Sequence, residues 1–104
     1  MSASYKLLQR ASHQLDDIFL YSLSKWGSVQ AEAYIKGLFE RFEDIAAQQA
    51  VSRPISAEFG VSGYFCIYKH HYIYWRYLPD NLVGIVTVLH ERMHQTARIQ
   101  KGFL

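Results

Sequence analysis

The strongest pattern in the chain is a series of three apolar runs within Gly63–Leu89, each seven or eight residues long. The runs Gly63–Lys69, His71–Leu78 and Leu82–Leu89 are separated by His70 and by a Pro-Asp-Asn break. They are rich in Tyr, Phe, Ile and Val, which fill pleated and half-buried surfaces. Runs of this length joined by tight polar breaks predict a three-stranded antiparallel meander.

Alternation of side chains assigns these runs to two faces of the predicted sheet. In the second run, one face carries Ile73, Trp75 and Tyr77, and the other carries Tyr72, Tyr74 and Arg76. In the last run it separates two sets, which are Val83, Ile85, Thr87 and Leu89 on one face and Gly84, Val86, Val88 and His90 on the other. Each set of the last run mixes large apolar residues with small or polar ones. The pattern therefore leaves open which face is buried.

Two amphipathic helices are predicted before the sheet. The first is expected to start from an N-cap at Ser12, to carry a broad apolar face and to end at Gly27. The second is expected to be capped by Ser28 and to cover residues 29–49. A single Gly-Ser step between them predicts a helical hairpin, whose apolar stripe packs on the sheet.

The length of 104 residues predicts one domain covering 1–104, with a short first strand over Tyr5–Gln9. Residues 93–100 are expected to form either a short helix or part of an exposed tail, so 95–104 is a possible flexible segment. The single cysteine, Cys66, excludes an internal disulfide and favours a reducing compartment. No long apolar segment is present, so we expect no signal peptide, no membrane span and a cytoplasmic protein.

Charge is distributed unevenly along the chain, although the formal net charge is only +2. Residues 1–60 carry six Lys or Arg against seven Asp or Glu, whereas residues 61–104 carry five against two and four of the five histidines. This basic half is compatible with an acidic protein partner or with nucleic acid. Aromatic residues make up 15% of the chain, which is high for so small a core and predicts that some rings lie at an interface.

The segment His90-Glu91-Arg92-Met93-His94 matches the H-E-x-x-H motif of zinc proteases. That motif requires a helix, so that both histidines bind one Zn²⁺, and it requires a third ligand. Here it follows a β-rich run, and residues 95–104 contain no His, Asp, Glu or Cys. Only a distant residue such as His70 or Cys66 remains as a third ligand, so we expect no metal and no cofactor.

Three segments in a fixed order carry a resemblance to a known family: Leu15–Gly27, Gln30–Ala46 and Gly63–Met93. The first ends in a Trp-Gly step, the last closes with a Val-Leu-His segment, and an Arg-Pro step at Arg53 precedes the sheet. This set resembles the ParE branch of the RelE/ParE toxin superfamily and covers most of the chain. The resemblance implies an α+β fold, with an N-terminal helical hairpin packed on a small twisted antiparallel β-sheet.

The resemblance also implies a function. ParE-type toxins of bacterial type II toxin–antitoxin modules inhibit DNA gyrase by trapping it on cleaved DNA, and they have no catalytic centre. A ParD-type antitoxin neutralises the toxin with a tail that folds on the toxin surface, which gives a hetero-oligomer. Operator DNA is then contacted only through the antitoxin. A long groove with apolar anchors is what such a tail requires.

The candidate binding residues follow from the charge asymmetry, the apolar first helix and the sheet ending of the family. The expected target-binding residues are His90, Arg92, Met93, Arg76, Lys69 and Arg53. The expected antitoxin-binding residues are Phe19, Leu20, Leu23, Tyr72 and Tyr74. No catalytic residue is assigned.

Two other hypotheses remain open at this point. A RelE-type, ribosome-dependent mRNA endoribonuclease needs a general base, a general acid and cations for the phosphate. His70, His71 and His90 with nearby arginines are possible parts of such a site, although only Arg76 falls in the middle of a strand. The other hypothesis is a toxin homologue that has lost its target and keeps antitoxin binding, which predicts no growth defect.

Overall fold

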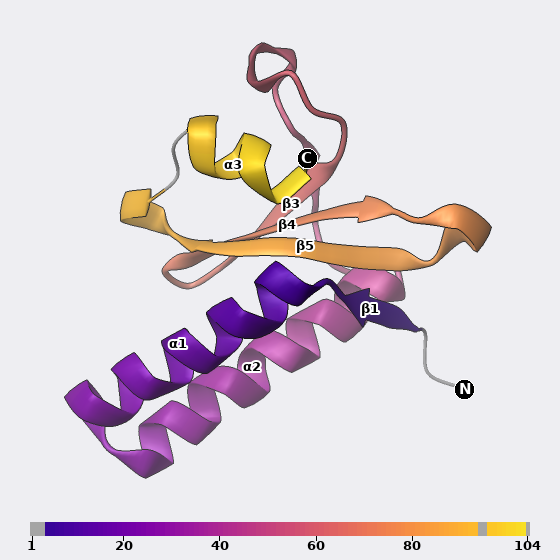
Figure 1. The fold of residues 1–104 in the computed structure, drawn as a ribbon. Helices are drawn as coiled ribbons and strands as arrows, with labels where there is room; N and C mark the ends of the chain where they lie inside the picture. The colour runs from indigo at the N-terminus through magenta and orange to yellow at the C-terminus, as the bar shows by residue number, and fades with distance from the viewer. Residues whose placement is uncertain (1–3, 94–95, 104) are drawn as a thin grey trace.

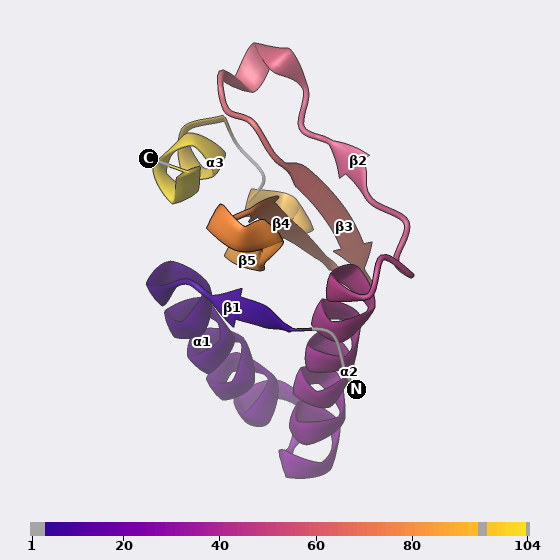
Figure 2. The same cartoon turned by 90° about the vertical axis from the view of Figure 1, so that its right-hand side faces the viewer.

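The computed structural model describes residues 4–93 and 96–103, and arranges them in three layers (Figure 1). A helical hairpin covers one face of a five-stranded sheet, and a short C-terminal helix covers the other (Figures 1 and 2). The helices and strands are β1 (Tyr5–Leu7), α1 (Gln9–Trp26), α2 (Ser28–Ala46), β2 (Arg53–Pro54), β3 (Tyr64–Tyr68), β4 (His71–Tyr77), β5 (Val83–His90) and α3 (Thr96–Phe103). Short 3₁₀ turns are η1 (Ala57–Phe59), η2 (Pro79–Asn81) and η3 (Glu91–Met93).

The helical hairpin is confirmed, with different capping from that predicted. Gly27 adopts φ 89° between the two helices, a conformation that glycine reaches without steric cost. Helix α1 begins at Gln9, and Ser12 lies inside it with its N–H donating to the carbonyl of Leu8 at 3.0 Å. The predicted N-cap at Ser12 is therefore wrong. The apolar residues of α1 that contact the core begin at Ala11, so the helix has to start before Ser12.

The sheet is mixed, and its strand order is β1-β5-β4-β3-β2. The predicted meander is confirmed, because β4 pairs antiparallel with β3 on one side and with β5 on the other. The expectation of a purely antiparallel sheet is wrong at the edge, since β1 pairs parallel to β5 through Tyr5–Val83 and Leu7–Ile85. A parallel pair requires a long connection, and here residues 8–82 supply it with α1, α2 and the strands β2, β3 and β4.

A β-bulge in β5 changes which of its residues share a face. The register runs from Tyr74–Thr87 to Trp75–Ile85, so Val86 is an extra residue in β5. Ile85 and Val88, three residues apart, consequently lie in the same core cluster under the helices. The two sets predicted by strict alternation for the last strand are therefore wrong beyond Val86, because one inserted residue inverts the alternation.

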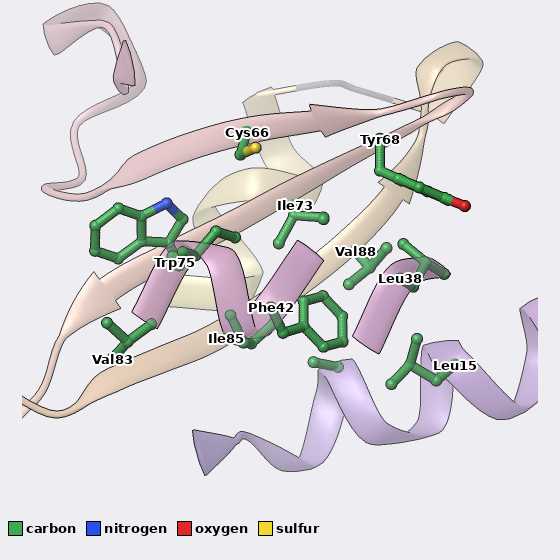
Figure 3. Close-up of a cluster of buried hydrophobic side chains, with 12 residues drawn as sticks. Leu15, Leu38, Phe42, Cys66, Tyr68, Ile73, Trp75, Val83, Ile85 and Val88 are labelled. Atoms are coloured by element: carbon green, nitrogen blue, oxygen red, sulfur yellow. The ribbon is translucent and has the colours of Figure 1, made fainter. Parts of the chain in front are cut away.

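The main core lies between the helical hairpin and the sheet (Figure 3). Phe42 and Leu38 on α2 are fully buried and point toward the strands (Figure 3). Gly37 lets α2 come close to β3, because a Cβ at this position would overlap the Tyr68 hydroxyl. The buried residues of this cluster are Ala11, Leu15, Leu38, Phe42, Ile45, Cys66, Tyr68, Ile73, Trp75, Val83, Ile85 and Val88.

The second face of the sheet is covered by α3, which decides between the two alternatives for the C-terminal segment. Ile99 is only 1% exposed and packs in a cluster with Ile55, Tyr74 and Leu89. Residues 96–103 therefore form a packed helix, which is the first of the two alternatives that the sequence left open. Both faces of β4 and β5 are buried under helices, so the alternation of side chains alone did not identify a single buried face.

Candidate partner-binding groove

A groove of about 910 Å³ separates the helical hairpin from one end of the sheet. Its sheet wall is formed by the turn between β3 and β4 and by the end of β5, which lie over α1 and α2 (Figure 1). The helices contribute Gln14, Asp17, Ile18, Tyr21, Ser22, Trp26, Gln30 and Tyr34, and the sheet contributes Lys69, His70, His71, Val88, His90, Glu91 and Arg92. Aromatic and cationic side chains thus face each other across the groove.

A tyrosine–histidine pair links the helical wall to the sheet wall. The Tyr34 hydroxyl and Nδ1 of His71 are 2.6 Å apart, and the two rings meet edge to face. Burial, together with the nearby His90 and His70, lowers the pKa of His71 to about 4, whereas Glu91 opposes the shift. Neutral His71 accepts the hydrogen bond from Tyr34, so the two layers are joined by an uncharged contact.

The other groups at this end of the sheet are stacked or paired. The rings of His71 and His90 meet edge to face, at the first position of the β4–β5 register. His70 Nδ1 lies 3.3 Å from a carboxylate oxygen of Glu91. The Lys69 ammonium lies over the rings of Tyr34 and Tyr68, 5.8 and 5.5 Å from their centres. Such cation–π contacts hold a cation in place while leaving it open to a partner.

The structure brings together half of the residues that we predicted to bind the target. Lys69, His90 and Arg92 all line the groove. Met93 ends the η3 turn that follows β5, next in the chain to Arg92. The remaining two lie elsewhere: Arg53 is on β2 at the opposite edge of the sheet, and Arg76 is a partly buried residue near the far end of β4.

The predicted antitoxin-binding residues fall on two different surfaces. Phe19 and Leu20 line a second groove of about 490 Å³, which α1, α2 and Leu7 of β1 form together. Leu23 follows on the same helix and is 39% exposed. Tyr72 and Tyr74 lie on the face covered by α3.

The prediction that Tyr74 offers a binding surface is wrong for this structure. Tyr74 is 3% exposed, because α3 and the segment around Ile55 cover it. Burial raises the pKa of its hydroxyl to about 12, in keeping with this setting. Tyr72 is partly buried and stacks on Phe65, with ring centres 5.9 Å apart.

The described part of the H-E-x-x-H segment, His90–Met93, does not form the α-helix that the zinc motif requires. His90 ends β5, and Glu91–Met93 form the 3₁₀ turn η3. Nδ1 of His90 accepts the N–H of Arg92 at 3.1 Å. His94 lies outside the described residues. Among the residues that the structure describes, no group of three His, Cys, Asp or Glu side chains is placed to hold a metal ion.

The low pKa of His71 predicts a pH-dependent stability. The unfolded chain binds a proton at His71 below about pH 6.5, whereas the folded chain does so only below about pH 4. This contribution is complete above pH 6.5 and is lost as the pH falls toward 4. Allowing for partial exposure, we expect the free energy of unfolding to fall by about 2 kcal/mol, measured by urea unfolding at pH 7.5, 5.5 and 4.5.

The matched variants for this measurement are His71→Gln and His13→Gln. His71→Gln removes the titrating group and should flatten the pH dependence by that amount. His13 is exposed on α1, so His13→Gln should follow the wild-type curve. Parallel curves for wild type and His71→Gln would contradict the assignment.

Comparison with known proteins assigns the chain to a family. A sequence model described as the ParE toxin of type II toxin–antitoxin systems, parDE, matches residues 5–95. The Toxin ParE1 of Caulobacter vibrioides is 34% identical over 96 residues, which cover 91% of this chain and 96% of that protein. The chain belongs to the ParE toxin family. Like the other members, this ParE-family chain is the toxin of a type II toxin–antitoxin module.

Two further relatives agree with this assignment. The Toxin ParE1 of Mycobacterium tuberculosis is 29% identical over 94 residues, which cover 89% of this chain and 94% of that protein. A chain in a solved structure described as the chromosomal ParDE TA system from P. aeruginosa superposes with a TM-score of 0.66 at 18% identity. That match covers 86% of this ParE-family chain and 96% of the other, and it supports the fold.

The groove contains residues that our sequence reasoning did not select. Tyr34, Gln14 and Trp26 come from the two helices, where helical spacing assigned residues either to the core or to solvent. The high aromatic content of the sequence had suggested that some rings lie at an interface. Trp26 fits this suggestion, because its side chain is 62% exposed and large exposed rings often mark an interface.

No helix among the described residues is long and apolar enough to cross a membrane.

Proposed function

We propose that this ParE-family toxin inhibits DNA gyrase by binding it, and that a ParD-type antitoxin neutralises it. Membership of the ParE family is the observation that carries the proposal. The similarity to a chain of a solved ParDE system supports an antitoxin partner of the same type. Neutralisation then means that the antitoxin occupies toxin surface that the target needs.

The target surface that we propose is the sheet wall of the groove and its rim. Lys69, His90 and Arg92 stand together there, and the side chain of Arg92 is exposed. Met93 follows directly and belongs to the same proposed surface. Exposed cations of this kind steer association with an acidic partner surface and fix its register. Arg53 and Arg76 remain separate and weaker candidates.

Binding rather than RNA cleavage is favoured by the setting of His71. An mRNA-cleaving site needs a base that titrates near neutral pH and cations that face the phosphate. The pKa of about 4 keeps His71 uncharged and makes it a weak base, and its Nδ1 is already engaged by Tyr34. This arrangement supports a recognition surface.

The proposed anchor for the antitoxin is the second groove, between α1, α2 and β1. Leu20 is 60% exposed, and Phe19 and Leu20 share a groove with Phe39 of α2. Apolar side chains exposed together in this way mark a protein-binding surface. An amphipathic helix from the antitoxin tail, with apolar residues at helical spacing, fits such a groove.

Purified gyrase tests the function directly. We expect the toxin to abolish supercoiling of relaxed plasmid and to accumulate linear DNA that is covalently linked to gyrase. Unaffected gyrase together with cleavage of mRNA on translating ribosomes would overturn the proposal in favour of a RelE-type endoribonuclease. Tight antitoxin binding with no effect on gyrase or growth would identify a homologue that has lost its target.

A further inference from the structure

The turn between β3 and β4 places a lysine in a backbone conformation that lysine rarely adopts. Strand β3 ends at Tyr68 and β4 begins at His71, so Lys69 and His70 form a two-residue hairpin turn. Lys69 has φ 51°, in the left-handed region. Such turns need a positive φ at their first position, which Gly, Asn and Asp supply at little steric cost. A lysine there brings its Cβ against the backbone, so the folded chain carries strain that a glycine would remove.

The contacts of the Lys69 side chain within the protein do not account for this strain. Its ammonium lies over the rings of Tyr34 and Tyr68, and the side chain is exposed. Exposed cation–π contacts contribute about as much as the left-handed conformation costs, so lysine adds little net stability here. The ion pair recorded among the described residues of this turn joins His70 to Glu91 and does not include Lys69.

The turn is held from two sides. On the side of β5, the carbonyl of His70 accepts the N–H of Glu91 at 2.8 Å, and the side chains of the same two residues pair. On the side of α2, the Tyr34 hydroxyl is bonded to His71. Strained conformations persist where the surroundings fix them in this way, and they cluster at functional sites. The strain at Lys69 therefore points to a role in recognition.

The two rings below the ammonium, Tyr34 and Tyr68, form a rigid support that we call the tyrosine platform. They meet edge to face with centres 5.3 Å apart, and Tyr68 is only 9% exposed. Arg41 of α2 lies 5.5 Å from the centre of the Tyr68 ring and donates to the carbonyl of Ile67 at 3.1 Å. A lysine on such a support loses less side-chain freedom on binding than an ordinary surface lysine.

We propose that Lys69 is a specificity-determining residue of the toxin, and that its ammonium, fixed on the tyrosine platform, pairs with a carboxylate on the protein surface of the target. This inference rests on the proposed function, because the target in question is gyrase. A carboxylate fits better than DNA phosphates. Proteins bind a phosphate backbone with many Lys and Arg, whereas the groove lining contains two such residues, Lys69 and Arg92. A single fixed cation selects a partner with its negative charge at one place.

The substitution Lys69→Gly removes the cation and the strain together. The thermal midpoint of the free toxin should stay at or above that of wild type, because relief of the left-handed backbone offsets the lost ring contacts. The toxin concentration for half-inhibition of gyrase supercoiling should nevertheless rise at least about tenfold. Opposite directions for stability and inhibition distinguish a recognition role from a structural one.

Gln48→Gly is the matched control for the relief of strain. Gln48 is an exposed residue with φ 60° that follows α2, and it is not among the groove-lining residues. Its replacement relieves the same kind of strain away from the proposed contact. We expect no change in half-inhibition of gyrase.

A double variant, Lys69→Gly with His70→Lys, separates the position of the charge from its presence. It moves the ammonium by one residue, to a position without a positive φ, and keeps the formal net charge. If the left-handed turn and the platform set the position that the target recognises, this variant should stay within about threefold of Lys69→Gly alone.

Ionic strength supplies a readout that a structural role would not change. The loss caused by Lys69→Gly should shrink from about tenfold near 0.05 M salt to below about threefold near 0.3 M salt, because salt screens a pair of exposed charges. Full inhibition by Lys69→Gly, recovery in the double variant, or a loss that follows a lowered thermal midpoint would each overturn the role of Lys69. These results leave inhibition by wild-type toxin standing, whereas gyrase that is unaffected by wild-type toxin would overturn the proposed function itself.

Discussion

Replacing Ile99 with alanine should lower the free energy of unfolding by about 2–4 kcal/mol, which is the usual cost of truncating a buried isoleucine. Ile99 is 1% exposed, and its side chain fills the second cluster together with Ile55, Tyr74 and Leu89. The truncation leaves a cavity between α3 and the sheet. Urea unfolding followed by far-UV circular dichroism measures the change.

The control for this prediction is Val51→Ala. Val51 is 83% exposed, so removal of its methyl groups should change the free energy of unfolding by less than about 0.5 kcal/mol. A change of that small size for Ile99→Ala as well would show that α3 adds nothing to the core. The C-terminal segment would then behave as the exposed tail that the sequence also allowed.

Arg92→Glu should raise the toxin concentration needed for half-inhibition of gyrase by at least about 30-fold. The change reverses an exposed charge in the proposed target surface, and loss of one contact in the centre of an interface typically costs about 2 kcal/mol or more. The hydrogen bond to His90 comes from the main chain of Arg92, so the substitution preserves it. A supercoiling assay over a titration of toxin gives the value.

Arg53→Glu is the matched comparison, because it makes the same charge reversal on an exposed residue at the opposite sheet edge. We expect less than a threefold effect. Both variants should keep the thermal midpoint of the wild type. Equal losses for Arg53→Glu and Arg92→Glu would point to net charge as the cause, and would remove the groove from the proposed target surface.

Local sequence patterns were sufficient to predict the main elements. The two helices, the Gly27 connection and the three-stranded meander follow from apolar spacing and turn residues, which act over a few positions. A first strand was predicted over Tyr5–Gln9 and is found at Tyr5–Leu7, but its parallel pairing was missed. Parallel pairing depends on where the helical hairpin returns the chain, and no local pattern records that.

The candidate site was only partly predictable. Lys69, His90 and Arg92 were selected from charge and position, and they do share one groove. Gln14 and Tyr34 were missed, because their partners Val88 and His71 are 74 and 37 residues away in sequence. Tyr74 was misplaced because the pattern of its own strand contains no sign that α3 covers it.

The sequence by itself determined the family, the order of elements and the concentration of basic residues in the second half of the chain. These depend on residue types and on spacings within a single element. The tertiary structure alone decided the mixed sheet, the β5 bulge at Val86 and the burial of both sheet faces. It also decided which side chains meet across the groove. Each of these features depends on the relative position of elements that are far apart in sequence, and packing of the whole chain fixes that position.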